Sequence, residues 1–167
     1  MDYKIFDKNC NTLDGRMDEP VWDTVPEFTG FSKLGSGAEI PEHSQTYFKF
    51  LPCEDRVYFG VKCMEPEMNR LKASSDSSMN HVDAFELFLA PSGSDYDYYQ
   101  LFVSAKGSKS GNYYEESGVI RPDPYAPYWE TAVYYGEDFW SVEVEIPFTA
   151  LYMTPQDRWT DKWLVNI

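Results

Sequence analysis

Alternation of hydrophobic and polar residues with a period of two is the main pattern along this chain. It is clearest over residues 139–148, FWSVEVEIPF, where apolar residues fill the even positions from 140 to 146 and polar residues fill positions 141, 143 and 145. The pattern predicts an antiparallel strand with one buried face and one face toward solvent. Pro147 should end its ladder, because proline has no N–H to donate.

Other stretches rich in β-branched and aromatic residues, each bounded by turn signals, are also predicted strands. They cover residues 45–51, 56–63, 83–90, 97–105, 129–135 and 163–167. Turn sequences at 91–95 and 135–138 should join 83–105 and 129–146 into two hairpins. Helical turns are expected only at 66–75 and 147–152, because no long window has helical spacing.

Seven or eight short strands with this spacing predict an all-β fold. The expected architecture is an antiparallel β-sandwich, like a jelly roll, with a few short helical turns. The length of 167 residues favours a single domain over 1–167.

Composition narrows the classes of partner. Aromatic residues make up 17% of the chain, which is too rich for disorder despite the net charge of −14. That acidity argues against nucleic acid and anionic membrane surfaces, and it suits neutral ligands or divalent cations. Solubility alone explains it equally well. No run of 18 apolar residues is present, so no spanning helix is expected.

The N-terminus and the cysteines allow predictions about the cellular compartment of the protein. No apolar signal segment follows Met1, so the protein is expected either to be intracellular or to have lost a leader. Cys10, Cys53 and Cys63 cannot all pair within one chain. A Cys53–Cys63 bridge is not expected either, because Cys53 would lie beside a turn at 54–55 and Cys63 at the far end of the next strand. Free thiols in a reducing or anaerobic setting are the simpler interpretation.

Groups for catalysis are scarce. The chain has two histidines, no G-x-S-x-G elbow, no C-x-x-C, no H-E-x-x-H and no Gly-rich phosphate loop. No two of the 28 acidic residues stand out as a glycosidase pair. The sequence therefore favours a protein that is not an enzyme.

Glu86 is the most informative acidic residue. In DAFELFL (83–89) it shares a face with Ala84 and Phe88, so its carboxylate should lie on a partly covered surface. Two interpretations are open: the carboxylate accepts hydrogen bonds from a hydroxyl-bearing ligand, or it pairs with a basic side chain of the neighbouring strand.

Aromatic residues between 113 and 129 are candidates for an exposed ligand platform. Tyrosine and tryptophan combine a rigid apolar face with a polar tip, which suits stacking against sugar rings. The candidates are Tyr113, Tyr114, Tyr125, Tyr128 and Trp129. The alternative is that these rings belong to the core.

Two weaker patterns concern metals. Asp95 and Asp97 lie two apart in a turn and could supply oxygen ligands to calcium, although a solvated turn explains them as well. His81 lies near methionines, and histidine with methionine is an axial pair for some haems. The chain has no C-x-x-C-H attachment site, and apolar filling at strand ends explains the methionines.

Several segments together resemble the carbohydrate-binding module family 9-like domains, within the wider DOMON-like sandwiches. LDGRMDEPVW (13–22) resembles the family's opening I-D-G-x-x-D-E-x-x-W, and HVDAFELFLAP (81–91) resembles its D-D-x-x-E strand. WETAVYYGEDFWSVEVEIPFTAL (129–151) is the most specific match. RVYFGVKCMEPE (56–67), YYQLFVSAKG (98–107) and WLVNI (163–167) also fit, in the family's order.

This resemblance implies a sugar-binding β-sandwich, in some members with structural calcium and with no organic cofactor. Glu86 matches the family's ligand-binding glutamate. The family's first clamp tryptophan falls on Asn80, and its arginine and asparagine fall near Phe102 and Ser104. The second clamp tryptophan and the last strands would lie beyond Ile167. The resemblance therefore implies a sandwich that lacks its closing strands, unless the natural protein is longer or another chain completes it, and an open strand edge would favour self-association.

The first hypothesis is a non-catalytic carbohydrate-binding module, associated with the degradation of plant polysaccharides and able to accompany a catalytic domain. Its expected contacts are Glu86, Asn80, His81, Tyr125, Tyr128 and Trp129. The alternatives are a haem-binding DOMON-type electron-transfer domain that uses His81 and a methionine, and a ligand-free interaction module of a larger glycoside hydrolase. In all of these readings Trp22 is expected to be a core residue.

Overall fold

The structure is a computed structural model that describes residues 4–7, 10–71, 82–93, 96–115, 120–122, 128–151 and 162–167, with only the backbone of 120–122. Contacts between residues divide the chain into two compact units. The first unit is formed from Met1–Leu71 and Thr131–Glu145, and the second from Lys72–Glu130 and Ile146–Ile167.

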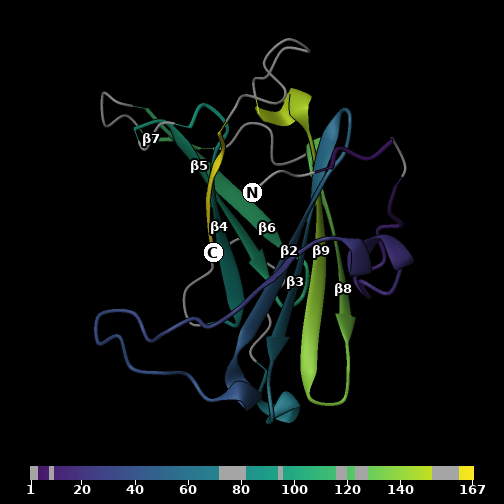
Figure 1. Cartoon of the computed structure of the whole chain (residues 1–167). Helices are drawn as coiled ribbons and strands as arrows, with labels where there is room; N and C mark the ends of the chain where they lie inside the picture. Colours follow the sequence, from purple (N-terminus) through teal and green to yellow (C-terminus); the bar gives the residue numbers. More distant parts are fainter. Residues whose placement is uncertain are drawn as a thin grey trace. The chain divides into compact units, whose positions relative to one another are not determined.

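Two five-stranded antiparallel sheets make up the fold, consistent with the predicted β-sandwich (Figure 1). The first sheet has the order β1-β2-β3-β9-β8, with β1 (Glu27–Phe28), β2 (Thr46–Pro52), β3 (Arg56–Met64), β9 (Phe139–Pro147) and β8 (Glu130–Tyr135). The second has the order β10-β4-β5-β6-β7, with β10 (Leu164–Asn166), β4 (Ala84–Ala90), β5 (Tyr98–Ser104), β6 (Lys109–Tyr114) and β7 (Ile120–Pro122).

Only short 3₁₀ turns accompany these strands in the described part of the chain: η1 (Pro20–Thr24), η2 (Glu42–Ser44), η3 (Met68–Arg70) and η5 (Phe148–Leu151). None of the described helices is long and apolar enough to cross a membrane. The predicted strand at 45–51 is β2, and every other predicted strand is likewise found within two residues of its expected ends. The 83–105 hairpin is confirmed by the antiparallel register that pairs Phe85 with Val103.

Strands β1, β6 and β7 have no counterpart in the sequence prediction. The β6 sequence, KSGNYY, contains lysine, glycine and asparagine, which are depleted in strands. All six of its residues are half-buried, so the strand shows no alternation. The backbone ladder with β5 defines this strand, and no pattern of hydrophobicity does.

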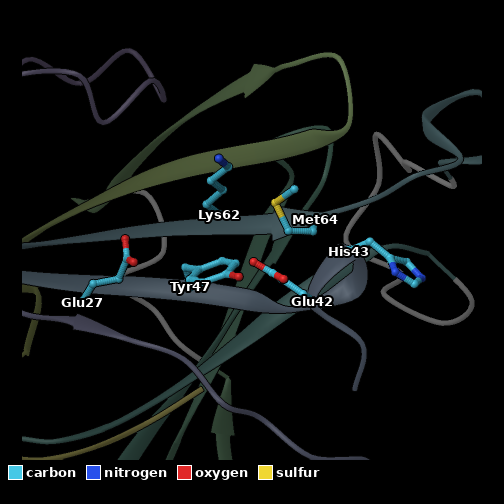
Figure 2. A pocket seen from close by; sticks show the side chains of 6 residues that line it. All are labelled: Glu27, Glu42, His43, Tyr47, Lys62 and Met64. Carbon is cyan, nitrogen blue, oxygen red and sulfur yellow. The ribbon is translucent and has the colours of Figure 1, made fainter. Parts of the chain in front are cut away.

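A hollow of about 510 Å³ opens on the first unit. It is lined by Glu27 of β1, Glu42 and His43 of η2, Tyr47 of β2, and Lys62 and Met64 of β3 (Figure 2). Figure 2 shows the Glu42 carboxylate pointing toward Tyr47, while the His43 ring points away from the other side chains.

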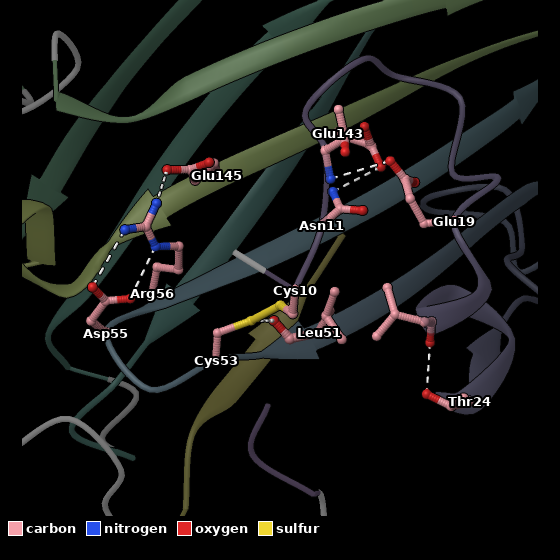
Figure 3. Close-up of a disulfide and its surroundings, with 12 residues drawn as sticks. Cys10, Asn11, Glu19, Thr24, Leu51, Cys53, Asp55, Arg56, Glu143 and Glu145 are labelled. Carbon is pink, nitrogen blue, oxygen red and sulfur yellow. Dashed lines mark hydrogen bonds and ion pairs between the residues drawn. A yellow bond between two sulfur atoms is a disulfide. The ribbon is translucent and has the colours of Figure 1, made fainter. Parts of the chain in front are cut away.

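The segment that precedes η1 is attached to the first sheet through Glu143 (Figure 3). Its carboxylate is completely buried and accepts four N–H groups. Oε1 accepts from the side chains of Asn11 at 3.0 Å and Trp22 at 2.9 Å. Oε2 accepts from the backbone of Asp14 at 2.9 Å and Gly15 at 2.8 Å.

The prediction of a solvent-facing side for β9 is therefore wrong. Ser141 is 1% exposed and Glu143 is 0% exposed, because the segment around Gly15 covers this face of the strand. The Ser141 hydroxyl donates to the Gly15 carbonyl at 2.6 Å. Gly15 has φ +85°, and a Cβ there would lie 2.7 Å from the backbone carbon of Val133, so only glycine allows this close approach.

Trp22 is a core residue, as predicted, with 1% of its surface exposed. It forms a buried cluster with Leu51, Cys53 and Tyr58. Its backbone carbonyl also accepts a hydrogen bond from the Lys49 ammonium at 3.0 Å. The opening segment thus contributes both apolar packing and polar contacts to the first unit.

The cysteines differ from the sequence expectation of free thiols. Cys10 and Cys53 form a disulfide, and Cys63 is not part of it (Figure 3). Phe6 brings the N-terminal segment alongside Cys53, because its N–H donates to the carbonyl of Pro52 at 2.9 Å. Spacing along the sequence does not reveal this approach, since the bridge joins residues 43 apart.

The first unit also contains an ion pair centred on Arg56. The Arg56 guanidinium contacts Glu145 at 2.5 Å and Asp55 at 3.0 Å (Figure 3). The hydrogen bond with Asp55 is the main cause of a raised pKa for Arg56. Burial, followed by the hydrogen bond with Glu145, raises the pKa of Tyr58 to about 12.

Candidate functional site

A polar and aromatic surface lies on one face of the sheet β10-β4-β5-β6-β7. Paired residues of neighbouring strands project to the same face, and the register pairs Phe88 with Gln100 and Tyr98 with Tyr114. Glu86 shares this face because it lies two residues before Phe88 on β4. We call these five half-buried side chains the Glu86 face: Glu86, Phe88, Tyr98, Gln100 and Tyr114.

The alternating sequences of β4 and β5 create this face. AFELFLA and YYQLFVS both place every second side chain in the protein interior. The buried set is Phe85, Leu87, Leu89, Tyr99, Leu101 and Val103. Because these apolar residues fix the register, the residues between them are held on the opposite face.

A chain of two hydrogen bonds crosses the Glu86 face. The Tyr114 hydroxyl donates to Gln100 Oε1 at 2.8 Å, and Gln100 Nε2 donates to Glu86 Oε2 at 2.9 Å. A carboxylate can only accept, so the Gln100 amide nitrogen must face Glu86. The amide therefore holds both neighbours in fixed positions across three strands.

The two interpretations of Glu86 differ in the partner that its carboxylate would have. Its neighbour is the amide of Gln100, and no ion pair involves Glu86 within the described part of the chain. The expected basic partner on the adjacent strand is therefore not present there. The carboxylate keeps acceptor capacity for a further donor, since each oxygen can accept two hydrogen bonds.

Aromatic rings lie beside the chain of hydrogen bonds formed by Tyr114, Gln100 and Glu86. Tyr98 and Tyr114 are stacked, with ring centroids 4.7 Å apart and planes 13° apart, and Phe88 lies 6.2 Å from Tyr98. A hollow of about 230 Å³ adjoins the rings, lined by Phe88, Leu89, Ala90, Tyr98, Leu164, Val165 and Asn166. Its lining is mainly apolar, with one amide.

Such a surface is suited to ligands that carry both hydroxyls and apolar C–H groups. Hydroxyls can donate to Glu86, and C–H groups can lie against the rings of Phe88 and Tyr98. Apolar walls with a few placed polar groups are typical of small-molecule sites. The surface is open and half-exposed, which favours weak binding.

Of the other residues predicted for sugar binding, the structure describes Tyr128 and Trp129. Tyr128 is 64% exposed, whereas Trp129 is 1% exposed and so is not the expected exposed platform. The Lys109 ammonium lies 5.2 Å from the Trp129 ring centre and donates to the Trp129 carbonyl. Lys109 thus helps to cover the ring.

Several predicted positions lie outside the described residues. Among the sugar contacts these are Asn80, His81 and Tyr125, and for calcium Asp95. Asp97 is half-buried. The calcium site at Asp95 and Asp97 therefore stays a prediction. Within the described residues, the acidic groups close enough to share a metal ion are those of Asp14, Asp18 and Glu19.

Sequence reasoning named only Glu86 and Tyr114 of the five residues on this face. The alternation in YYQLFVS would have placed Tyr98 and Gln100 on the same side, but pairing them with Tyr114 requires β6, which the pattern does not reveal. Tyr113, the other tyrosine candidate on β6, pairs with Tyr99 on the opposite face, with ring centres 4.8 Å apart.

Comparison with solved structures shows which proteins share this fold. A protein from Bacteroides uniformis ATCC 8492, to which carbohydrate binding is ascribed, matches with a TM-score of 0.66 and 15% identity over 89% of this chain and 73% of its own. A carbohydrate-binding module of family 9 from Caldicellulosiruptor kristjanssonii matches in two complexes. With cellotriose the TM-score is 0.54 at 14% identity, and with glucose it is 0.52 at 15%.

Each of those two matches covers 86% of this chain, which spans 66% and 68% of the respective module chains. No family model matches the sequence, and no curated protein is significantly similar to it. The structural likeness shows a fold like that of family 9 carbohydrate-binding modules, as the sequence resemblance predicted.

Proposed function

We propose that this chain is a non-catalytic carbohydrate-binding module, that the Glu86 face contacts the sugar, and that the module assists an enzyme that degrades plant polysaccharides. The observation that carries the proposal is the Tyr114–Gln100–Glu86 chain of hydrogen bonds beside the stacked rings. It supplies an acceptor for hydroxyls and an apolar surface for the sugar ring in one place.

The comparisons support the same ligand class. The module from Caldicellulosiruptor kristjanssonii has this fold and was captured with cellotriose and with glucose. The family's clamp is not reproduced in the sequence here, where Asn80 stands at the position of its first tryptophan. We therefore expect a different and weaker contact set, centred on Glu86 and the rings of Phe88 and Tyr98.

Calorimetric titration with neutral oligosaccharides built from glucose, xylose or mannose tests the proposal. Glu86→Gln should weaken binding of the best sugar about tenfold, because a hydrogen bond to a charged acceptor contributes roughly 1.5–3 kcal/mol. Glu130→Gln is the matched control, because Glu130 is exposed and pairs with Lys109. No heat from any sugar at millimolar concentration would argue strongly against a carbohydrate-binding function.

The alternative readings stay predictions. His81, the expected haem ligand, lies outside the described residues, as does Met79. No feature of the described residues specifically favours a haem-binding role or a ligand-free interaction role. The appearance of a Soret band on reconstitution with haem, and its loss in His81→Ala, would favour the electron-transfer reading over ours.

A further inference from the structure

We propose that the hollow of the first unit is a second binding site for neutral saccharides, with Tyr47 as its floor. The site takes the same class of ligand as the proposed function but shares no residue with the Glu86 face. It is built on β1, β2, β3 and η2, whereas the Glu86 face is built on β4, β5 and β6.

The sheet register places the lining side chains on one face. Tyr47 pairs with Lys62, and Met64 lies two residues further along β3, so all three project to the same side. Glu27 pairs with Lys49, which lies two residues from Tyr47 and shares this side. The η2 turn then places the carboxylate of Glu42 toward Tyr47 (Figure 2).

The polar groups of the hollow are available to a ligand. In the described residues, neither the Glu42 carboxylate nor the Tyr47 hydroxyl has a hydrogen bond or ion pair. Glu27 makes only a long contact of 3.8 Å with Lys49, and its side chain is 50% exposed. Two carboxylates as acceptors and one phenol therefore surround a partly exposed aromatic ring.

Lys62 adds a donor at the wall of the hollow. Its ammonium lies 4.1 Å from the centre of the Phe139 ring, an arrangement that holds the charge in place without using a carboxylate partner. Three N–H groups are thereby presented near a ligand that lies on Tyr47. Met64 provides an apolar edge to the same hollow.

Charge balance indicates a neutral ligand. The carboxylates of Glu27 and Glu42 are matched locally by the ammonium groups of Lys49 and Lys62, although the whole chain carries −14. A site without net charge gives an ion little electrostatic preference. A sugar, by contrast, uses acceptors, donors and a planar apolar surface together.

The size of the hollow agrees with this ligand class. Its volume of about 510 Å³ falls within the range of roughly 300–1,000 Å³ found for small-molecule sites.

Nuclear magnetic resonance of the ¹⁵N-labelled chain separates the two sites. Cellotriose, xylotriose and mannotriose are titrated one at a time to tens of millimolar. For at least one sugar we expect shifts at the backbone amides of Tyr47, Lys62 and Met64, with a dissociation constant different from that at Phe88 and Gln100. Shifts at the Glu86 face alone would overturn the second site and leave the proposed function standing.

The remaining outcomes are also decisive. Shifts confined to the hollow would support the second site and overturn the role of the Glu86 face. Absence of shifts at both places for all three sugars would overturn both proposals.

Variants test the residues of the hollow. Tyr47→Ala should weaken the binding measured at the Lys62 amide about tenfold. Tyr47→Phe keeps the aromatic ring and should weaken this binding much less. Glu42→Gln should weaken it severalfold, with the exposed Glu39→Gln as its matched control. Unchanged binding in both Tyr47→Ala and Glu42→Gln would contradict the site, and Glu42→Gln still provides the test if Tyr47→Ala fails to fold.

Discussion

At the scale of single residues, Glu143 does the most to hold the opening segment in place. Four N–H groups converge on its buried carboxylate, and two of them are the consecutive backbone N–H groups of Asp14 and Gly15. Burial raises the pKa of Glu143, while the hydrogen bonds from Asn11, Gly15 and Asp14 act in the opposite direction. The arrangement requires that both side-chain oxygens act as hydrogen-bond acceptors.

Glu143→Gln should therefore destabilise the protein although it preserves the shape of the side chain. The new amide nitrogen would face N–H donors and leave them unpaired in the interior, at a cost of about 2–4 kcal/mol in the free energy of unfolding. Urea unfolding measures this loss. Glu137→Gln, in the exposed turn between β8 and β9, is the control, and an equal stability of the two variants would refute the role given to Glu143.

Tyr58 should make the stability sensitive to alkaline pH. Its pKa is raised to about 12 in the folded state, whereas an unfolded tyrosine titrates near 10. Above pH 10 the unfolded chain loses the proton first, so the stabilisation that is complete below pH 10 declines as the pH rises toward 12. The loss should reach about 2 kcal/mol.

Urea unfolding between about pH 9 and pH 12 checks this expectation, with Tyr58→Phe as the reference. The difference in stability between the two proteins should shrink or reverse over this range. A constant difference would mean that Tyr58 titrates alike in the folded and unfolded states.

Sequence reasoning at this scale succeeded for Trp22 and failed for Glu143. The prediction for Trp22 rested on the resemblance of residues 13–22 to the family's opening motif, in which the tryptophan marks the fold. Glu143 occupies a polar position in a strand with a clean period of two, and this pattern predicts a side chain that faces solvent. Its burial depends on a segment more than a hundred residues away, and a local pattern contains no information about that contact.

At the scale of elements, strong alternation and paired turn signals are what made the strands predictable. The ends of β4, β5, β8 and β9 fell within two residues of their predicted positions, because each carries apolar residues at every second place. β6 and β7 could not be found in this way. One of the five residues of the Glu86 face, Tyr114, lies on β6, so the candidate site was only partly accessible from sequence.

The disulfide ties two elements together and should contribute measurably to stability. Cys10 lies in the opening segment and Cys53 directly after β2, and the bridge closes a loop of 43 residues. Chain-entropy estimates for a loop of this length give about 3–4 kcal/mol. We expect a reducing agent to lower the melting temperature of the natural chain.

Cys10→Ser should show the lowered melting temperature without reductant and should not respond to it further. Cys63→Ser is the matched control, because Cys63 is outside the bridge, and it should keep the full response. If reductant leaves the melting temperature of the natural chain unchanged, the bridge either does not form or does not stabilise the fold.

At the scale of the whole molecule, the two proposed sugar sites do not depend on the acidity of the chain. The net charge of −14 comes from 28 acidic and 14 basic residues, yet the Glu86 face contributes a single carboxylate and the hollow of the first unit is locally balanced. Neither proposed site relies on the electric field that the net charge of the whole chain produces. From the net charge we expect polyanionic partners to be disfavoured.

Affinity for a neutral oligosaccharide should consequently depend little on salt. Between about 0.05 and 0.5 M sodium chloride we expect the dissociation constant to change less than about twofold, because no counter-ions are released. Calorimetry at the two salt concentrations gives the answer. A steep salt dependence would show that a charged ligand or partner is being bound instead.

The way in which the opening segment is attached sets a limit on how this chain can be shortened or fused. A fragment that begins after Val25 would lack every donor of Glu143 and one half of the disulfide, and it would uncover Leu51 and Tyr58. A fusion partner joined ahead of Phe6 disturbs none of these contacts. The segment from Cys10 to Val25 is therefore as much a part of the folding unit as the strands that follow.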